Sequence, residues 1–297
     1  MNEIAIDIVC PVYKGYDYLK PLYNSFLTQK NVTINKIVFP ITDSEDEQMP
    51  LIREFVKKNN IESFEVKKNE FSHSLTRQKA IIEHCESPIV VMLSQDIKLA
   101  DDMVFYNLVK DIHTGETAYN YAKQICTNNS IEKYIRERNY PDTSYIVSKD
   151  DIEKMQIMAF FASDACPAYD RDTFIHLGGY GGYNVMMNED QLYSKILLDA
   201  GYKKKYCADA IVEHSHKYTL KQVYKRYYEV GLFYSEVGLF DTYKSANTGF
   251  KLALYALCQA VKHLDIPAIL RWLPDMAARY LGMKFGKIAG KNNTSNR

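Results

Sequence analysis

Between residues 4 and 94 the chain alternates between short apolar runs and longer amphipathic stretches, and this alternation constrains the fold most strongly. The apolar runs are typical of buried strands, whereas the stretches 17–29 and 75–85 have a helical period. Such an order builds β-α-β units around a largely parallel sheet. The predicted strands are IAIDIVC (4–10), INKIVFPI (34–41), IESFEV (61–66) and PIVVMLS (88–94). We therefore predict an α/β fold with a mostly parallel, Rossmann-like sheet flanked by helices.

Polar and aromatic side chains follow these predicted strands. Within VVMLSQDIKL (90–99) the apolar run ends in Ser94-Gln95-Asp96, and Tyr13, Asp43 and Arg77 also fall beyond strand ends. Ligands of open α/β sheets bind outside the carboxyl ends of the strands. The sequence thus predicts a binding site at this edge of the sheet.

The second half of the chain has a weaker pattern. Residues 114–154 show no strong period and predict loops and short elements, and 158–169 reads as a strand. A glycine-rich loop (178–190) precedes a helix that stops at Gly201, and 203–216 predicts two short strands. From Leu220 onward the pattern is helical. We predict a catalytic domain over residues 1–219 and a C-terminal helical extension over 220–297.

Composition excludes some functions. The 37 Lys and Arg residues balance 37 Asp and Glu residues, and no basic block of the kind that binds nucleic acid occurs. The six cysteines are scattered and form no Cys-x-x-Cys pair, and the first ten residues do not have the pattern of a signal peptide. We expect a cytoplasmic protein with reduced thiols and no nucleic-acid partner.

Five motifs, in order, carry a resemblance to a known family. They are IVCPVYKG, NEFSHSLTRQKA, LSQDI, GGYGGYNVMMNEDQLYSKILLDAGY and VEHSHKYTLKQVYKRYYEVG. Together they resemble family 2 glycosyltransferases of the GT-A fold, and among these most closely bacterial rhamnosyltransferases that use dTDP-rhamnose. The resemblance covers about residues 4–235 and implies an inverting sugar transferase.

Sugar transfer from a nucleotide donor develops charge on a diphosphate leaving group, which a divalent cation can stabilise. The resemblance implies that Asp96 holds Mg²⁺ or Mn²⁺, although Ser94-Gln95-Asp96 replaces the usual Asp-x-Asp. His214 and His216 flank Ser215 at a predicted strand end, so they point to the same side and one can complete the site. Family position favours His214. The alternatives are that Asp96 only caps the following segment and that the histidine pair is structural.

Donor recognition needs an aromatic surface and polar partners. Tyr13 can stack on a pyrimidine, Asp43 can accept a hydrogen bond from the base, and Arg77 can contact base or phosphate. Asp46 is an alternative to Asp43 because the stretch PITDSEDE is compressed relative to the family pattern, and Tyr13 could instead pack in the core. The remaining candidate donor contacts are His73, which could instead serve helix entry, Gln95 and Arg226.

The acceptor hydroxyl must lose a proton to a general base as it attacks. Glu189 and Asp190 begin the helix beneath the glycine-rich loop, and family position favours Asp190. Adjacent helical residues point about 100° apart, so both are not expected to face one hydroxyl. Alternatively, the two acids only stabilise the helix N-terminus. Asp164 is a candidate acceptor contact.

The C-terminal extension is locally basic. Residues 262–297 contain seven Lys and Arg residues against Asp265 and Asp275, interleaved with apolar residues. The stretch 252–261 is too short to span a bilayer. A basic amphipathic helix on an anionic membrane fits this pattern and suits a lipid-carried acceptor. Packing on the catalytic domain, or homodimerisation, fits nearly as well.

The sequence therefore predicts a glycosyltransferase that moves a sugar, L-rhamnose from dTDP-L-rhamnose, to a growing lipid-linked cell-surface polysaccharide on the cytoplasmic face of the membrane. The alternatives are a related transferase that uses another UDP- or dTDP-sugar and a non-catalytic module that binds a nucleotide-sugar or glycan. A structural scaffold at the membrane is a weaker alternative.

Overall fold

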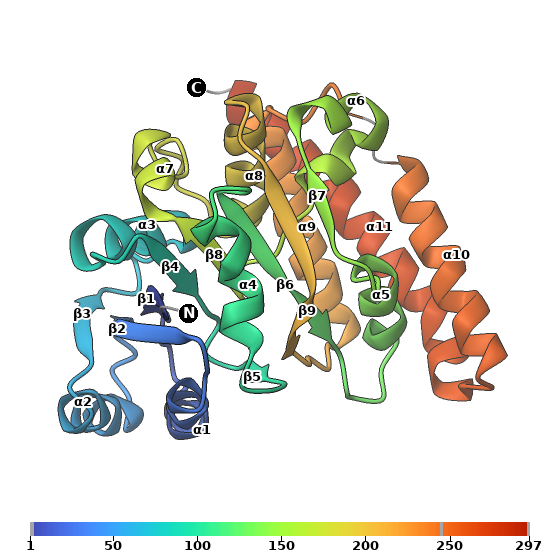
Figure 1. The fold of residues 1–297 in the computed structure, drawn as a ribbon. Helices are drawn as coiled ribbons and strands as arrows, with labels where there is room; N and C mark the ends of the chain where they lie inside the picture. The colour runs from blue at the N-terminus through green and yellow to red at the C-terminus, as the bar shows by residue number, and fades with distance from the viewer. Residues whose placement is uncertain (1–2, 244–245, 296–297) are drawn as a thin grey trace.

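A computed structural model describes residues 3–243 and 246–295. Its first half is a parallel sheet with helices on both faces (Figure 1). Strands β1, β2 and β4 pair in parallel, as does β3 with β2. The strands of this half are β1 (Ile4–Val9), β2 (Val32–Thr42), β3 (Glu62–Val66) and β4 (Ile89–Met92), and the helices are α1 (Tyr16–Leu27), α2 (Gln48–Lys58), α3 (His73–Lys79) with the π-helical turn η1 (Ala80–His84), and α4 (Val104–His113).

Two hydrophobic clusters cover the two faces of the sheet. Because side chains alternate along a strand, Ile89 and Val91 of β4 join one cluster while Val90 and Met92 join the other. The first cluster contains the buried faces of α1, α2 and α4, and the second contains η1. The predicted α/β fold is confirmed, and each of the four predicted strands is present within two residues of its predicted ends.

The complete sheet is mixed rather than mostly parallel. Nine strands of the described chain form one sheet in the order β3-β2-β1-β4-β8-β6-β9-β5, with β7 on β9. Strand β8 is antiparallel to both of its neighbours, whereas β6 and β9 are parallel. The strands of the second half are β5 (Lys98–Leu99), β6 (Tyr119–Ile125), β7 (Tyr145–Val147), β8 (Pro167–Asp170) and β9 (Lys204–Glu213).

Three local predictions for the second half need correction. Residues 114–154 contain β6, a long buried strand at the centre of this half, and the helix α5 (Glu132–Asn139). The stretch 158–169 begins as the 3-10 turn η3 (Gln156–Phe160) and extends only from Pro167. The two predicted strands of 203–216 are one strand, β9, whose register against β6 shifts between Ala122 and Lys123. The short helices here are η2 (Lys149–Asp151), α6 (Ile152–Met155), α7 (Arg171–His176) and α8 (Glu189–Asp199).

The C-terminal region is helical, as predicted. It consists of α9 (Leu220–Val237), α10 (Ala246–Lys262) and α11 (Ile266–Ser295). Thr219 and Gln222 form a capping box that starts α9, which ends at Gly238 with φ +66°. Gly282, Gly286 and Gly290 of α11 lie directly against α9, where an added Cβ at each would overlap Tyr224, Tyr228 and Ser235. The glycines therefore permit the close packing of α9 and α11.

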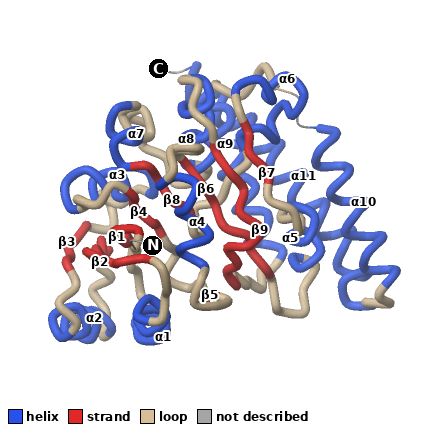
Figure 2. Tube along the Cα trace, viewed as in Figure 1, coloured by secondary structure: helices blue, strands red, loops and turns tan. Residues whose placement is uncertain are grey.

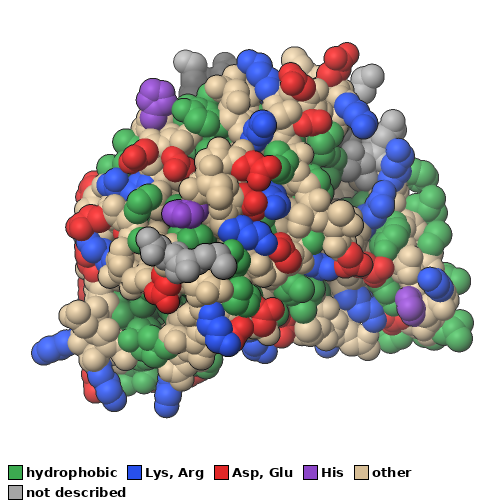
Figure 3. Space-filling model, viewed as in Figure 1, with side chains coloured by type: hydrophobic (Ala, Val, Ile, Leu, Met, Phe, Trp, Pro, Cys, Tyr) green, Lys and Arg blue, Asp and Glu red, His purple; other side chains and the backbone are tan. Residues whose placement is uncertain are grey.

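Helix α10 lies at the outer edge of the molecule, where it packs against α5 and α11 (Figure 2). Figure 3 shows hydrophobic side chains together with Lys and Arg gathered over this edge. Among the described helices, none combines the length and hydropathy needed to cross a bilayer. The six cysteines, all in the described part of the chain, form no disulfide.

Candidate active site

Two adjoining cavities lie at the carboxyl edge of the sheet. The first, of about 430 Å³, is formed by the segments that follow β1 and β4 together with Thr42, Lys68 and Phe71, and we call it the strand-edge cavity. The second, of about 450 Å³, lies between the sheet and the helices α5, α8, α9 and α11, and we call it the helical cavity. The two share His73, Arg77, Ser94 and Met186 as lining residues. A molecule bound in one cavity therefore borders a molecule bound in the other.

Tyr13 and Gln95 shape the strand-edge cavity. The Tyr13 backbone N–H donates to Gln95 Oε1 at 2.9 Å, and Gln95 Nε2 donates back to the Tyr13 carbonyl at 2.8 Å. The predicted donor contact Gln95 thus holds the loop after β1. The Tyr13 side chain is exposed at this cavity, and the Lys14 and Lys68 ammonium groups lie 5.7 and 6.0 Å from its ring centroid. An open aromatic ring between two cations suits a stacked base that carries phosphates.

Asp43 lies beside this cavity, but Thr42 forms its wall instead. The Asp43 carboxylate accepts a hydrogen bond from the Glu45 N–H at 3.0 Å. Asp46, the alternative considered from the sequence, is ion-paired with Lys14 at 3.0 Å. Arg226 lines the helical cavity and not the strand-edge cavity, with its guanidinium 5.9 Å from the Tyr218 ring centroid.

Asp96, His214 and His216 converge at the border of the two cavities. Among the described residues, they form the one group of three side chains whose ligand atoms could share a metal ion, with all three atoms within 4.8 Å of one another. The His214 and His216 Nε2 atoms lie 3.4 and 3.6 Å from the Asp96 oxygens and 2.7 Å from each other. The histidine at the end of β9 and the carboxylate after β4 meet because β4 and β9 end at the same edge of the sheet. The structure thus brings the three predicted metal ligands together.

Gln124 of β6 orients one of these ligands. Its Oε1 lies 3.0 Å from His214 Nδ1, and because an amide oxygen only accepts, Nδ1 carries the hydrogen. His214 Nε2 then presents its lone pair toward Asp96, the tautomer that a metal ion requires. Gln124 is 3% exposed, and Arg136 of α5 donates to the same oxygen. The residues present therefore fit a divalent cation.

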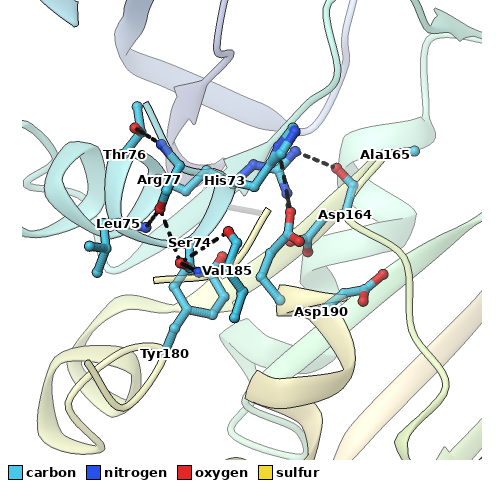
Figure 4. Close-up of polar contacts among 12 residues, drawn as sticks. His73, Ser74, Leu75, Thr76, Arg77, Asp164, Ala165, Tyr180, Val185 and Asp190 are labelled. Atoms are coloured by element: carbon cyan, nitrogen blue, oxygen red, sulfur yellow. Dashed lines mark hydrogen bonds and ion pairs between the residues drawn. The ribbon is translucent and has the colours of Figure 1, made fainter. Parts of the chain in front are cut away.

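Arg77 joins two predicted site residues in a buried ion network. Its Nη1 atom lies 2.6 Å from Asp164 Oδ2 and 2.5 Å from Glu189 Oε1 (Figure 4). All three side chains are less than a tenth exposed. Asp164 also accepts from the Tyr169 hydroxyl at 2.8 Å. Two carboxylates and one guanidinium thus link α3, α8 and the segment before β8.

Asp190 lies next to this network but points away from Arg77 (Figure 4). It lines the helical cavity, and its Oδ1 accepts from the Gln191 N–H at 2.7 Å. Burial, followed by the charges of Asp164 and Glu189, holds the pKa of Asp190 well above its usual value. Burial also raises the pKa of Asp164 to about 6. A carboxylate with a raised pKa at a cavity wall can serve as a general base.

The glycine-rich loop is fixed by α3. The Ser74 hydroxyl donates to the Tyr183 carbonyl at 2.7 Å and accepts from the Val185 N–H at 2.9 Å. Gln78 accepts from the Tyr180 N–H, and Gly179, with φ +61°, leaves the space that the Gln78 side chain occupies. The segment NEFSHSLTRQKA therefore holds the loop that leads into Glu189 and Asp190.

His73 lies at the junction of the two cavities. Its Nδ1 is 3.7 Å from Glu189 Oε1 and has no hydrogen-bond partner among the described residues. Burial, aided by the positive charge of Arg77, lowers the pKa of His73 to about 3. A neutral imidazole thus faces the border between the cavities.

Sequence reasoning missed several residues of the site. Gln124 and Arg136 belong to the region that was predicted to be irregular, and Arg279 and Met283 of α11 belong to the predicted extension. Helices α9 and α11 contribute a wall of the helical cavity, so residues on both sides of position 219 line it. The alternation of tyrosines in YNYAKQI was the available signal for β6.

The same architecture occurs in solved glycosyltransferases. The mannosyltransferase PcManGT from Pyrobaculum calidifontis, solved with GDP-Man and Mn²⁺, has a TM-score of 0.61 at 13% identity, over 98% of this chain and 88% of that one. TarS 1-349 of S. aureus, solved with UDP-GlcNAc, has a TM-score of 0.56 at 14% identity, over 99% and 93%. The fold of this chain is therefore the GT-A fold of these glycosyltransferases.

Two curated relatives are more specific. The chain is 29% identical over 292 residues to the O-antigen chain rhamnosyltransferase RfbN of Salmonella typhimurium, covering 96% of this chain and 90% of the relative. It is 28% identical to the O-antigen chain rhamnosyltransferase WbaN of Salmonella anatum, covering 95% and 89%. No protein-family model matches the chain. The predicted resemblance to rhamnosyltransferases of the GT-A fold is confirmed.

Proposed function

We propose that the chain is a metal-assisted, inverting glycosyltransferase that moves L-rhamnose from dTDP-L-rhamnose to a lipid-linked surface polysaccharide. One observation carries this proposal. Asp96 of the metal-ligand group lines the strand-edge cavity, whereas Asp190 lines the helical cavity, and the two cavities adjoin. The leaving diphosphate and the attacking hydroxyl would thereby meet their cation and their proton acceptor in neighbouring cavities, as sugar transfer requires.

The donor occupies the strand-edge cavity in this proposal. The Tyr13 ring stacks on the base, and Lys68, which lines the same cavity, approaches the phosphates. Asp43 remains a candidate partner for the base from its position beside Thr42. His73 and Arg77, at the junction, border the sugar. Gln95 acts through the Tyr13 loop, which it clamps from both sides.

Asp96, His214 and His216 hold Mg²⁺ or Mn²⁺ in this proposal. When bound, the cation supplies positive charge to the diphosphate oxygens as the sugar leaves. Gln124 fixes the His214 tautomer, and Arg136 and Arg226 add positive charge on the side of the helical cavity. The PcManGT structure, which has the same fold, was solved with Mn²⁺.

Asp190 accepts the proton of the attacking hydroxyl. Glu189, its neighbour, is already ion-paired with Arg77 at 2.5 Å, whereas Asp190 forms no ion pair among the described residues and so suits the role of base better. Asp164, at the wall of the same cavity, borders the acceptor. A single base that activates a hydroxyl for direct displacement gives inversion at the sugar carbon.

The acceptor occupies the helical cavity. The full-length similarity to two O-antigen chain rhamnosyltransferases supports a growing surface polysaccharide as its chemical class. Such a lipid-linked chain would be met at the cytoplasmic face of the cell membrane. In this proposal residues 1–219 form the catalytic domain, and α9 and α11 complete its acceptor side.

A panel of nucleotide-sugars tests the donor. Melting temperature and hydrolysis are measured with dTDP-rhamnose, other dTDP-sugars and UDP-sugars, each with Mn²⁺ or Mg²⁺. The proposed donor should raise the melting temperature most through ligand linkage, and only with a cation present. A larger shift with a UDP-sugar would reassign the donor. Tight binding without transfer to any acceptor would favour a binding module.

A further inference from the structure

Helices α10 and α11 form a hairpin that leaves many large apolar side chains exposed. On α10 the buried positions are the small residues Ala256 and Ala260, which pack with Ile131, Tyr134 and Ile135 near α5. Leu252 packs against this cluster, whereas the large apolar residues Phe250, Leu254 and Val261 of α10 are exposed. An amphipathic helix of a water-soluble surface buries its large apolar residues and exposes polar ones.

The outward side carries a continuous apolar stripe, which we call the hairpin face. Its residues recur at helical spacing along both helices, so they share one side of each. They are between 48% and 78% exposed. The members are Phe250, Leu254, Val261, Leu264, Ile266, Leu270 and Leu273. Tyr280, Leu281, Phe285 and Ile288 continue the exposed stripe along α11. A patch of this extent on a water-soluble protein marks an interaction site.

The charge of the hairpin face has one sign. Exposed Lys251 and Lys262 directly follow Phe250 and Val261, and Lys284 lies on the stripe of α11. The hairpin contains two carboxylates, and both are turned inward to cations. Asp265 lies 2.5 Å from Lys133, and Asp275, which is 1% exposed, lies 2.6 Å from Arg279. Among the described residues of the hairpin, no acid therefore offsets the exposed lysines.

We propose that the hairpin face binds the surface of an anionic membrane, with α10 and α11 lying in the plane of the headgroups. Large apolar side chains flanked by lysines suit the boundary between acyl chains and negatively charged headgroups. No described helix can span the bilayer, so the face lies on it rather than through it. A second copy of the chain fits less well, because a symmetric interface would bring lysines of both copies together without carboxylates to pair with them.

The hairpin also borders the active site, which links this surface to the acceptor side. Arg279 and Met283 line the helical cavity from another side of α11. Membrane binding itself does not depend on the proposed sugar transfer, so it is measured on the full chain without donor or acceptor. Truncation is avoided because α11 packs on α9 and completes the cavity.

Vesicle co-sedimentation tests the face. The full chain is mixed with vesicles of phosphatidylglycerol and phosphatidylcholine in equal parts, or of phosphatidylcholine alone. We expect binding to the anionic vesicles that weakens in high salt, because screening reduces the attraction of lysines to headgroups. The variant Leu270→Gln/Leu273→Gln should lower the partition coefficient by at least about tenfold. Leu27→Gln, at an exposed leucine of α1, is the matched control and should bind like the wild type.

Unchanged melting temperature and donor-induced stabilisation show that the variants are folded. Equal binding of the double variant and the wild type would overturn the proposal, as would the absence of binding to anionic vesicles. Analytical ultracentrifugation measures the oligomeric state and so tests the alternative that a second copy of the chain binds the hairpin face. A wild-type dimer that Leu270→Gln/Leu273→Gln converts to monomer, without vesicle binding, would also overturn it.

Discussion

Gln124 accepts a hydrogen bond from His214 across 3.0 Å, and the same amide oxygen accepts from Arg136. One buried side chain therefore sets the tautomer of a candidate metal-ligand histidine and the position of the Arg136 guanidinium beside it. Its Nε2 in turn donates to the Tyr140 and Ser163 hydroxyls, so the amide cannot rotate without losing several hydrogen bonds.

Replacing Gln124 should weaken metal binding more than folding. Gln124→Leu removes the acceptor of His214 Nδ1–H, and we expect the affinity for Mn²⁺ to fall by about 10- to 100-fold, the usual effect of losing such a partner. Isothermal titration with Mn²⁺ measures this directly. Gln124→Glu keeps an acceptor, and the Tyr140 and Ser163 hydroxyls can rotate to donate to it, so this variant should retain most of the affinity. Equal losses in both variants would contradict a positioning role.

Chelation should abolish transfer, and Mn²⁺ should restore it at lower concentration than Mg²⁺. Two of the three candidate ligands are imidazoles, which suit Mn²⁺ better than Mg²⁺, an ion that prefers oxygen ligands. Asp96→Asn should weaken Mn²⁺ binding and transfer together. The measurements are a metal titration of activity after EDTA treatment and a thermal shift with each ion. Full activity in the chelator would exclude a metal-assisted reaction.

Asp190→Asn should separate catalysis from donor binding. The substitution keeps size and hydrogen bonding but removes the proton acceptor, so transfer should fall by about 10²- to 10⁴-fold while donor affinity changes little. Glu189→Gln is the comparison. It should lower the melting temperature, because Arg77 loses one of its two carboxylates, and it should slow transfer less. A larger loss of transfer in Glu189→Gln would reverse the two assignments.

The pH profile of transfer should report the charges around Asp190. A general base acts when ionised, so the rate should rise with pH through the pKa of Asp190, which burial and the neighbouring acids Asp164 and Glu189 raise. Asp164→Asn removes one of those negative charges, which lowers the pKa of Asp190, and the acidic limb of kcat against pH should move to lower pH. Asp172→Asn, at an acid that is 93% exposed, should leave the limb in place. An unmoved limb in Asp164→Asn would place the base elsewhere.

Gly286→Ala tests the packing of α11 on α9. An added Cβ would overlap the Tyr228 carbonyl, and we expect a loss of about 1–3 kcal/mol in the free energy of unfolding. Gly249 of α10 has no atom within 4 Å of an added Cβ. Gly249→Ala should therefore stabilise the protein by up to about 1 kcal/mol through helix propensity. Chemical denaturation measures both, and equal effects would show that the close contact is not constraining.

The strands of the first half and their ligand edge could be predicted because each strand is a short segment rich in apolar residues between amphipathic helical stretches. Asp96, His214 and Asp190 were selected from their motifs, and their roles stay predictions that the geometry supports. Strand β6 was missed because only the alternation of Tyr119 and Tyr121 indicates it, while the strand is buried on both faces and carries polar side chains. Asn120 is fully buried and donates to the Leu108 carbonyl, and Gln124 is nearly so. Buried amides with satisfied hydrogen bonds occupy strand positions that polarity alone would assign to the solvent-exposed side.

The ion-pair and hydrogen-bond networks around these residues could not be predicted from the sequence either. Nothing in the spacing of Arg77, Asp164 and Glu189 indicates that one guanidinium holds two carboxylates from distant segments. The contribution of α11 to a cavity wall depends on how far the C-terminal helices fold back, which hydrophobic periodicity does not record. The helical period of α10 could be recognised from the sequence. The side of α10 that faces inward could not, because small alanines occupy its buried positions.

The glycines of α11 allow this helix only one packing position against α9. If α11 shifted along α9 by one residue, or rotated about its own axis, its side chains would overlap the backbone at Tyr224 and Tyr228. The two helices therefore form one rigid unit. One side of α11 in this rigid unit places Arg279 at the helical cavity, and another side carries part of the hairpin face. In the proposed arrangement, with the hairpin face on a bilayer and Asp190 as the base, the distance from the bilayer plane to Asp190 is fixed. Only an acceptor hydroxyl that projects to that height above its lipid anchor would then reach Asp190.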